Sequence, residues 1–385
     1  MKILLATDSY LHQINGVTNA VITLAQELRR REHDARILAP AGENTSFRRE
    51  NTYLIRSVPT KLYPDFRVCL VRRDPLLDEL KAWKPDLIHL HTEGSIVRLA
   101  YIIADAAHAP VVMTTHTDYA KFFFGRFSDT ICVRGIMKLY GKLIYRRAAA
   151  VTVPSRKARG LAMVQAAGDR VTVIPNGIPL ERFQRPVSAA DRSGLLRQYG
   201  FTDHGCTLVA VARLSREKNL MEILRYFPKL LKTLPKAQLL IVGDGPDRRR
   251  LERFTDGKGL SGRVRFTGRI DPEDVCRYYA SGDVFVSAST FETQGLTYLE
   301  ALACGLPMVC RDDPVLRNVL ENEENGYTYR SEQEFINGIA RVTRDAGKWR
   351  EMHEKALKMA ENFGTAACAE QTLALYEQVL RLHCR

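Results

Sequence analysis

Residues 291–307 read FETQGLTYLEALACGLP and lie between two short apolar runs, residues 284–286 and 308–310. The pattern predicts a strand, a loop, a helix and a second strand. Glu292 is expected in the loop that follows the first strand. Glu300 is expected about two turns into the helix, at 3.6 residues per turn. The stretch therefore predicts an α/β fold with two carboxylates near the end of one strand.

The segment between the two carboxylates predicts an anion site. Gly295, Leu296 and Thr297 are expected to open the helix, so their backbone N–H groups lack partners within it. Such amides and the positive end of the helix dipole suit a phosphate group, and the neighbouring carboxylates suit sugar hydroxyls. By spacing alone, two such acidic residues are more often surface residues of a helix. The glycine turn and the flanking apolar runs favour a site.

Apolar runs alternate with longer helical patterns in both halves of the chain, which predicts two parallel sheets with helices on their faces. The expected strands are Ile3–Thr7, Asp34–Leu38, Leu87–Leu90, Val111–Thr115, Ala150–Val153 and Val171–Ile174, then Thr207–Ala212, Gln238–Val242, Val264–Thr267, Val284–Ser287 and Pro307–Cys310. Ligands on such open sheets bind beyond the carboxyl ends of the strands. Two such domains that face each other form a cleft.

An irregular stretch at 176–206 contains Pro-Asn-Gly, Ile-Pro and Arg-Pro, which predicts a domain boundary near it. We expect a first domain at residues 1–180, a second at 181–364, and a C-terminal helix within 365–385.

The segment 291–307 resembles the Glu-x7-Glu motif of family 4 retaining glycosyltransferases, which have the GT-B fold. The family-level match covers essentially the whole chain. The resemblance implies that Glu300 holds the ribose hydroxyls of a nucleotide sugar and that Glu292 contacts the hexose. It implies that the amides of Gly295, Leu296 and Thr297 contact phosphate or sugar. It also implies front-face attack assisted by the departing phosphate, no metal, and a last helix that crosses back to the first domain.

Two basic side chains follow the first strand of the second half, where residues 211–219 read VARLSREKN. Transfer from a nucleotide-diphosphate sugar expels a dianionic leaving group. The guanidinium group of Arg213 and the ammonium group of Lys218 would stabilise this leaving group without a metal. The run resembles the family's Arg-x4-Lys motif, and the alternative is a solvated basic loop.

Three further features predict contacts with the sugar donor, less specifically than the two motifs above. Gly16 follows the first strand, where a glycine lets backbone approach a diphosphate, or serves only to turn the chain. Gly243 lies in a Gly-Asp-Gly-Pro turn that resembles the family's nucleotide side. The backbone of Arg269 and Ile270 occupies the place that meets the base in relatives. No Gly-x-Gly-x-x-Gly follows the first strand, which weighs against a dinucleotide oxidoreductase.

His116 ends a strand of the first half, in the run Thr114-Thr115-His116-Thr117. A lone histidine after a strand is usually structural. Its place matches the family's histidine between acceptor and donor sugar, which implies a hydrogen bond to the hexose or a charge contact at the transition state. Asp118 and Tyr119 are expected to face the acceptor.

The net charge of +13 is concentrated in residues 121–159, which carry ten Lys and Arg against one acid, Asp129. Arg134, Lys138, Lys142 and Arg146 recur every fourth residue and would form a stripe on one helix, flanked by apolar positions. With a second aromatic-basic patch at Lys61–Arg73, the segment Lys121–Arg147 is typical of an interfacial helix that binds anionic lipid. The alternative is a solvated basic edge on an ordinary helix.

The run His116-Thr117-Asp118-Tyr119, the segment Glu292–Glu300 and these two basic patches together resemble bacterial diacylglycerol glucosyltransferases. The resemblance implies UDP-glucose as donor, a membrane lipid hydroxyl as acceptor, and a peripheral place on the inner face of the cell membrane. A soluble acceptor, such as a polysaccharide or a small sugar, stays open. So does a non-catalytic sugar-nucleotide sensor.

Other classes are disfavoured. The chain has no recognisable nucleic-acid motif to explain its basic pI. No run approaches the roughly 18 apolar residues of a membrane-spanning helix. The eight cysteines form no Cys-x-x-Cys pair and suit buried thiols in a reducing cytoplasm, with neither disulfides nor zinc. No cofactor other than the sugar donor is expected.

Overall fold

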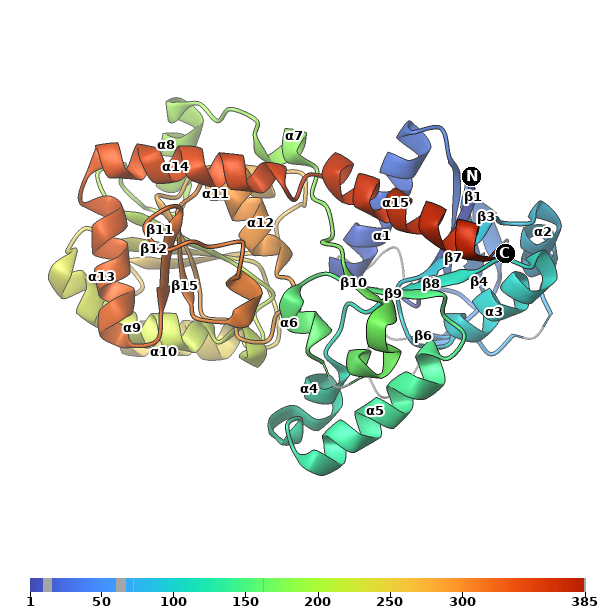
Figure 1. The fold of residues 1–385 in the computed structure, drawn as a ribbon. Helices are drawn as coiled ribbons and strands as arrows, with labels where there is room; N and C mark the ends of the chain where they lie inside the picture. Colours follow the sequence, from blue (N-terminus) through green and yellow to red (C-terminus); the bar gives the residue numbers. More distant parts are fainter. Residues whose placement is uncertain (10–15, 60–66, 72, 162, 384–385) are drawn as a thin grey trace. The chain divides into compact units, whose positions relative to one another are not determined.

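The computed structural model describes residues 1–9, 16–59, 67–71, 73–161 and 163–383 (Figure 1). The chain divides into two compact units. Unit 1 comprises Met1–Ile178 together with Thr365–Arg385, and unit 2 comprises Pro179–Gly364. Each unit is built around its own sheet.

Unit 1 has an eight-stranded sheet in the order β10-β9-β8-β7-β1-β2-β4-β3, in which all pairs are parallel except β3 with β4. Its strands are β1 (Lys2–Ala6), β2 (Asp34–Pro40), β3 (Phe47–Arg49), β4 (Thr52–Ile55), β7 (Leu87–Leu90), β8 (Val111–Thr114), β9 (Ala150–Val153) and β10 (Val171–Val173). A separate two-residue pair joins β5 (Val58–Pro59) to β6 (Arg67–Val68). The central strands are buried on both faces, as parallel sheets require.

Helices cover both faces of this sheet. They are α1 (Gly16–Arg30), α2 (Pro75–Trp83), α3 (Ile96–Ala107), α4 (Tyr119–Phe124), α5 (Ile131–Tyr145) and α6 (Arg156–Arg159), with 3-10 turns η1 (Gly125–Phe127) and η2 (Val164–Arg170). Leu4 of β1 packs in the core shared with α2, α3 and α5, whereas its neighbours Ile3 and Leu5 pack in the core shared with α1. The alternation follows from the period of two along a strand.

The C-terminal helix α15 (Thr365–His383) belongs to unit 1 and lies beside α1 (Figure 1). Leu375, Tyr376 and Val379 contribute to the same core as α1. Arg31 donates to the carbonyl of Ala366 at 3.0 Å. The end of the chain is therefore part of the first sheet's helical layer.

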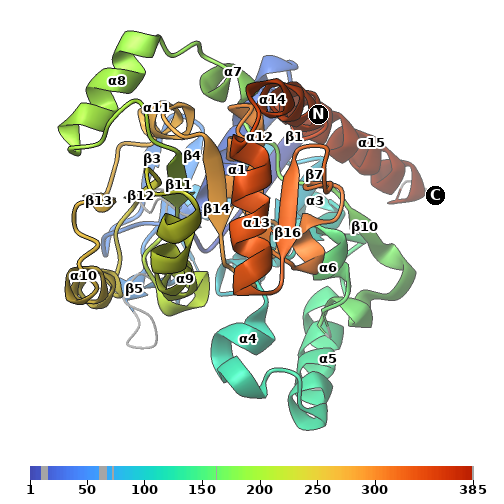
Figure 2. The ribbon, with the colours of Figure 1, turned by 90° about the vertical axis from the view of Figure 1, so that its left-hand side faces the viewer.

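Unit 2 has a six-stranded parallel sheet in the order β13-β12-β11-β14-β15-β16. Its strands are β11 (Thr207–Val211), β12 (Gln238–Val242), β13 (Val264–Gly268), β14 (Val284–Ser287), β15 (Met308–Arg311) and β16 (Gly326–Tyr329). The order reverses at β11, and Figure 2 shows this sheet with helices on its two sides. In open α/β sheets the reversal point is where ligands bind.

The helices of unit 2 are α7 (Leu180–Phe183), α8 (Ala189–Gln198), α9 (Leu220–Thr233), α10 (Arg248–Gly257), α11 (Val275–Ala280), α12 (Leu296–Ala303), α13 (Glu332–Thr343) and α14 (Ala346–Glu361), with 3-10 turns η3 (Arg216–Lys218) and η4 (Pro314–Leu316). One core joins α9, α13 and the sheet, and a smaller one joins α8 and Tyr278 of α11 to its other face.

The expected strands are all present, and each of their ends lies within two residues of the expected position. Strands β3 to β6 and β16, which have two to four residues each, were not predicted. Helix α1 begins at Gly16 itself, directly after the residues that lie outside the described ranges. Glu300 lies just over one turn into α12 and not about two, because the helix begins at Leu296.

Candidate active site

The site in unit 2 is built at the carboxyl ends of its central strands. Lys218, in η3 after β11, donates from Nζ to Oε1 of Glu292 at 2.5 Å. Ser289 donates to the same oxygen at 2.9 Å. Glu292 lies in the loop between β14 and α12, so the pair joins two neighbouring strand ends. Both side chains are partly buried, which strengthens the ion pair relative to an exposed one.

Gly295 sets the start of α12. Its φ of +75° lies in the left-handed region, which residues other than glycine rarely adopt. A Cβ atom there would lie 2.5 Å from the ring of Tyr298. The glycine therefore lets the chain turn sharply into the helix, and the first-turn amides of Leu296 and Thr297 begin directly after Glu292's loop.

Glu300 is held by a tyrosine that the sequence analysis missed. Tyr279 of α11 is fully buried and donates its hydroxyl to Oε2 of Glu300 at 2.7 Å. The same hydroxyl lies 3.4 Å from the carbonyl oxygen of Thr297. Burial raises the pKa of Glu300, and the hydrogen bond from Tyr279 opposes that shift. Tyr279 thus fixes the carboxylate against the first turn of α12.

Glycines of the turn after β12 shape the loop that carries Arg213. A Cβ atom on Gly243 would lie 2.0 Å from the carbonyl oxygen of Ala212, and one on Gly245 would lie 2.5 Å from that of Leu214. The backbone of Leu214 donates to Asp244 at 2.9 Å. Gly243 therefore lets the loop after β12 pack directly against the loop after β11. Arg213 itself is exposed.

Arg269 and Ile270 follow β13 on the same edge of the sheet. The amide of Gly243 donates to the carbonyl of Gly268 at 3.1 Å, which links this segment to the turn after β12. Arg269 is exposed, whereas Ile270 packs against the core that includes Tyr278. The predicted residues of the second half are thus gathered along one sheet edge, from β13 through β12 and β11 to β14.

In unit 1, His116 lies directly beyond β8 and is buried. Its Nε2 lies 3.1 Å from Nδ1 of His91, and its Nδ1 lies 3.4 Å from the amide nitrogen of Asn176. Burial lowers the pKa of His116 to about 4. The ring is therefore neutral at physiological pH, which favours a hydrogen-bonding role over a charge contact.

Asp118 and Gly16 have defined structural places. Asp118 is buried and caps α4 by accepting the amide of Lys121 at 3.1 Å, an arrangement that stabilises a helix start. Tyr119 stacks on Phe123 at 5.9 Å between ring centres. Gly16 is the exposed first residue of α1. The loop before it, including Asn15, lies outside the described residues.

A buried carboxylate, Glu93, lies next to the predicted acceptor residues and was missed by the sequence analysis. Its Oε1 accepts from the Tyr145 hydroxyl at 3.4 Å, and Tyr145 also contacts the Thr115 hydroxyl at 2.6 Å. Tyr140 of α5 donates to the backbone carbonyl of Glu93 at 2.9 Å. Burial raises the pKa of Glu93 to about 7. This polar cluster joins α5 to the residue before His116.

Polar residues in and directly after β7 could have indicated the positions that were not predicted, since the run at 87–93 reads LIHLHTE. His89, His91 and Glu93 alternate through the end of the strand. Such residues at a strand's carboxyl end are candidates for a site, but buried structural histidines produce the same pattern.

Among the residues described, no group of three or more His, Cys, Asp or Glu side chains is placed to hold a metal ion. In the same part of the chain, no helix is long and apolar enough to cross a membrane.

Comparison with known proteins places the chain in a family. Residues 14–182 match the model described as Glycosyltransferase Family 4, and residues 195–362 match that described as Glycosyl transferases group 1. The alpha-monoglucosyldiacylglycerol synthase of Streptococcus pneumoniae is 32% identical over 94% of this chain and 84% of its own length. The chain is a family 4 glycosyltransferase. Retention of configuration and independence from metal are typical of this family.

A second relative of this glycosyltransferase is the alpha-monoglucosyldiacylglycerol synthase of Acholeplasma laidlawii, 29% identical over 89% of the chain and 88% of that protein. The crystal structure of Anabaena HepE in complex with UDP matches with a TM-score of 0.77 at 21% identity, over 98% of this chain and all of that one. These findings confirm the GT-B fold and hexosyl transfer as the activity.

Proposed function

We propose that this glycosyltransferase moves glucose from UDP-glucose to the hydroxyl of a membrane lipid such as diacylglycerol. The observation that carries the lipid acceptor is the exposed face of α4 and α5. It is apolar and basic at once, and two relatives carry names that describe glucosylation of diacylglycerol.

Helix α5 presents three faces. Val133, Met137, Gly141 and Tyr145 pack into unit 1. Next to them, the basic stripe of Arg134, Lys138, Lys142 and Arg146 is exposed along the helix. Leu139 and Leu143, on the side of the stripe away from the packed face, are 70% and 68% exposed.

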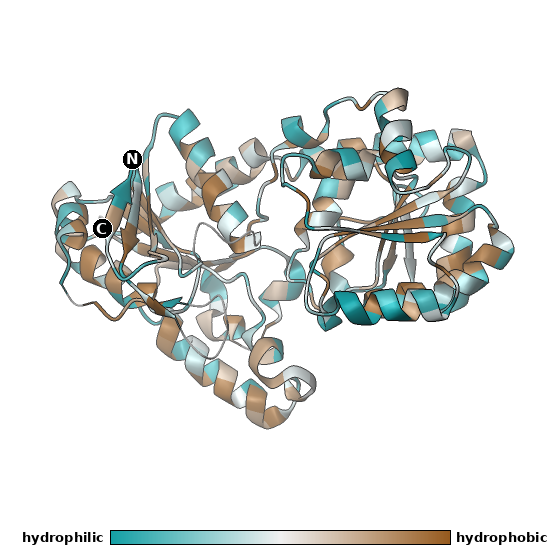
Figure 3. Ribbon diagram, turned by 180° about the vertical axis from the view of Figure 1, so that it is seen from behind, coloured by the Kyte–Doolittle hydropathy of each residue, from teal (hydrophilic) through white to brown (hydrophobic). Residues whose placement is uncertain are grey.

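The apolar surface continues beyond α5. Ile131, at the start of the helix, is 89% exposed, and Phe123 and Phe127 of the preceding turns are 59% and 54% exposed. Brown, hydrophobic segments run along α4 and α5 in Figure 3. Large apolar side chains beside a row of cations are the composition of a helix that lies in the headgroup region of an anionic membrane.

The second patch, Lys61–Arg73, is described only in part, since residues 60–66 and 72 lie outside the described residues. Leu70 is exposed, and Arg67 donates to the Ser57 carbonyl at 2.8 Å. We retain this patch as a secondary contact with the membrane.

On the donor side, we assign Glu300 to the ribose hydroxyls and Glu292 to the hexose. Arg213, Lys218 and the amides of Gly295, Leu296 and Thr297 would face the diphosphate. Gly16, Gly243, Arg269 and Ile270 would bring backbone close to the diphosphate and the base. The sugar donor is then a substrate, and no further cofactor is needed.

In the transfer step, the lipid oxygen forms a bond to C1 of the hexose as the bond from C1 to the diphosphate oxygen breaks. The hydroxyl proton passes to the departing phosphate, on the same face of the sugar. Lys218 stabilises the charge that develops on the leaving group, an electrostatic contribution that requires no change in the protein during the step. His116, being neutral, contributes a hydrogen bond to the hexose.

Vesicle co-sedimentation tests the membrane part of the proposal. Wild type is expected to bind vesicles that contain anionic lipid. Changing the four residues of the basic stripe to Gln should release it, because each cation near an anionic surface contributes about 1 kcal/mol. High salt should have the same effect, since exposed charges are screened within about 8–10 Å.

A matched control removes four exposed cations from unit 2: Arg225, Lys232, Arg249 and Arg253, each changed to Gln. This control has the same change in net charge and is expected to bind as wild type does. Equal loss of vesicle binding in both variants would show that only the net charge matters and not the position of the stripe. Binding by neither wild type nor control would favour a soluble acceptor. Salt-sensitive binding to DNA by wild type would instead support a nucleic-acid partner, which we do not expect.

A further inference from the structure

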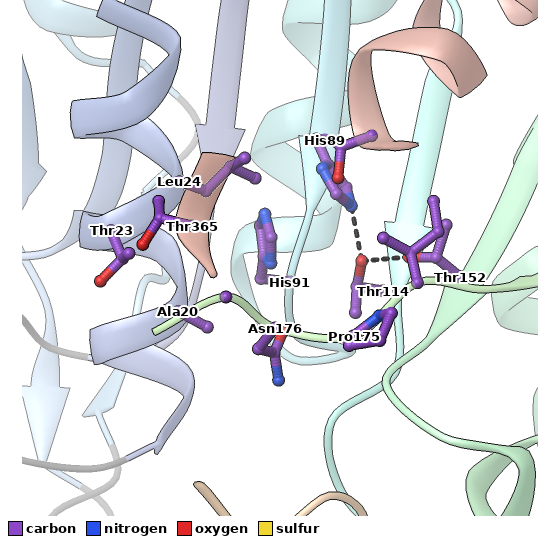
Figure 4. Close-up of a pocket in the computed structure, with 13 residues that line it drawn as sticks. Ala20, Thr23, Leu24, His89, His91, Thr114, Thr152, Pro175, Asn176 and Thr365 are labelled. Atoms are coloured by element: carbon purple, nitrogen blue, oxygen red, sulfur yellow. Dashed lines mark hydrogen bonds between the residues drawn. The ribbon is translucent and has the colours of Figure 1, made fainter. Parts of the chain in front are cut away.

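Three buried histidines, His89, His91 and His116, lie in a row in unit 1. Figure 4 shows two of them, His89 and His91. The rings of His89 and His91 are 4.0 Å apart between centres, and those of His91 and His116 are 5.4 Å apart and nearly parallel. Burial lowers the pKa of His89 to about 3 and that of His116 to about 4, and it also lowers the pKa of His91. Each ring is therefore neutral and carries one proton, on one of its two nitrogens.

The hydrogen bonds fix where those protons lie. The amide nitrogen of Asn176 can only donate, so Nδ1 of His116 accepts at 3.4 Å. The proton of His116 is then on Nε2, which faces Nδ1 of His91 at 3.1 Å. Nδ1 of His91 accepts it, and the proton of His91 is on its own Nε2.

Nε2 of His91 is buried and has no hydrogen-bond partner among the described residues, and the same holds for the hydroxyl of Thr365. Both residues line one cavity of about 30 Å³, together with the polar residues Thr23 and Asn176. A polar cavity holds a water molecule when about 10–15 Å³ of such volume and two to four partners are available. One water fits, and it can accept from His91 and bond to Thr365.

His89 also lines this cavity, and the C-terminal helix contacts its ring. Nδ1 of His89 lies 2.5 Å from the hydroxyl of Tyr376 in α15, and its Nε2 lies 2.6 Å from the hydroxyl of Thr114. Thr114 in turn contacts the hydroxyl of Thr152 (Figure 4). Both ring nitrogens of His89 thus contact hydroxyl groups of the fold. Of the ring nitrogens of His91, Nδ1 contacts His116 and Nε2 has no protein partner among the described residues.

We propose that His91 is a positioning residue that holds His116 in the tautomer protonated on Nε2. In that form, Nδ1 of His116 is an acceptor. The contact from Asn176 is long and can be replaced by a hydroxyl of the hexose. This inference rests on the proposed role of His116 toward the sugar, because the bond made by one ring nitrogen decides what the other can do.

Nitrogen-15 NMR of the enzyme labelled in histidine tests the tautomer without measuring activity. Wild type is expected to show His116 with a protonated Nε2 and an unprotonated Nδ1. His91→Asn keeps an acceptor near the position of Nδ1 and should preserve this pattern. His91→Leu removes the acceptor and should convert His116 to a mixture of tautomers. If His91→Leu does not fold, His91→Gln serves the same purpose, since its amide group lies near the place of Nε2.

Steady-state kinetics then separate positioning from folding. For His91→Leu, kcat should fall roughly 10-fold or more, with little change in KM for the donor, because a misplaced group costs mainly in the reacting geometry. His91→Asn should recover most of that loss.

An Nδ1-protonated His116 in wild type would overturn the proposal, as would an unchanged tautomer and kcat in the folded Leu or Gln variant. If instead the tautomer behaves as expected but His116→Ala transfers hexose at the wild-type rate, the proposed role of His116 fails and the tautomer assignment stands.

Discussion

The ammonium of Lys218 lies 2.5 Å from Oε1 of Glu292, so two residues assigned to different parts of the donor are bonded to each other. The lysine is assigned to the leaving diphosphate and the glutamate to the hexose. In the proposed site, the pair would hold both groups at the place where the bond between hexose and phosphate breaks.

Because the two side chains act as a unit, their mutational effects should not add. We expect Lys218→Ala and Glu292→Gln each to lower kcat/KM by roughly 100-fold or more, in line with the loss of a preorganised charge. The double variant should lose much less than the product of the two. A double-mutant cycle on the transfer rate measures this coupling. Strictly additive losses would mean that the ion pair has no part in catalysis.

Arg213→Ala should also lower the rate by roughly 100-fold, because Arg213 is assigned to the same leaving group. Wild-type activity should persist in the presence of a chelator. Activity that disappears with chelator and survives the Arg213 and Lys218 variants would contradict the metal-free account.

Glu300 and Tyr279 should affect donor binding more than turnover. Losing a hydrogen bond to a charged group costs about 1.5–3 kcal/mol, so Tyr279→Phe and Glu300→Ala should each weaken UDP-glucose binding by roughly 10-fold to 100-fold. Isothermal titration with the donor and the measured kcat separate the two effects. Tyr278→Phe, on the same helix, removes a hydroxyl that contacts Tyr199 and not Glu300, and should bind the donor normally. Unaltered affinity in the Tyr279 and Glu300 variants would remove both from the ribose site.

The stability of the protein should depend on pH through Glu93. Its pKa is raised from 4.5 to about 7 by burial, so the folded state binds a proton more tightly than the unfolded state. Stability therefore falls as pH rises from about 4.5 to 7, by up to ~3 kcal/mol. Glu93→Gln should remove this contribution. The difference in urea midpoint between the variant and wild type should therefore shift in favour of the variant as pH rises from about 4.5 to 7. Glu351→Gln, an exposed control, should track wild type. Parallel curves for wild type and Glu93→Gln would show that the pKa of Glu93 is the same in the folded and unfolded states, contrary to this account.

The positions in the fold of the residues proposed for the donor could largely be predicted, because these residues are close together in sequence. Glu292, Gly295 and Glu300 lie within one loop and one helix, and the parallel sheet brings the ends of β11 to β14 to a common edge. The histidine row and the Glu93 cluster could not be predicted in the same way. Their bonds join residues from β7, β8, α5 and α15, so they depend on how distant segments pack. The functional role of His116 stays a prediction, and neither its burial nor its contact with His91 was predicted.

The central claim is that hexose moves from the nucleotide to a lipid hydroxyl at an anionic surface. The most direct measurement incubates the enzyme with UDP-glucose labelled in the sugar and with vesicles of diacylglycerol and anionic phospholipid, then counts label extracted into the organic phase. We expect label to enter the lipid phase in an α linkage by proton NMR, and to fall when the anionic lipid is replaced by a zwitterionic one. Label that stays in the aqueous phase while a soluble sugar or polysaccharide acceptor becomes labelled would contradict the lipid acceptor.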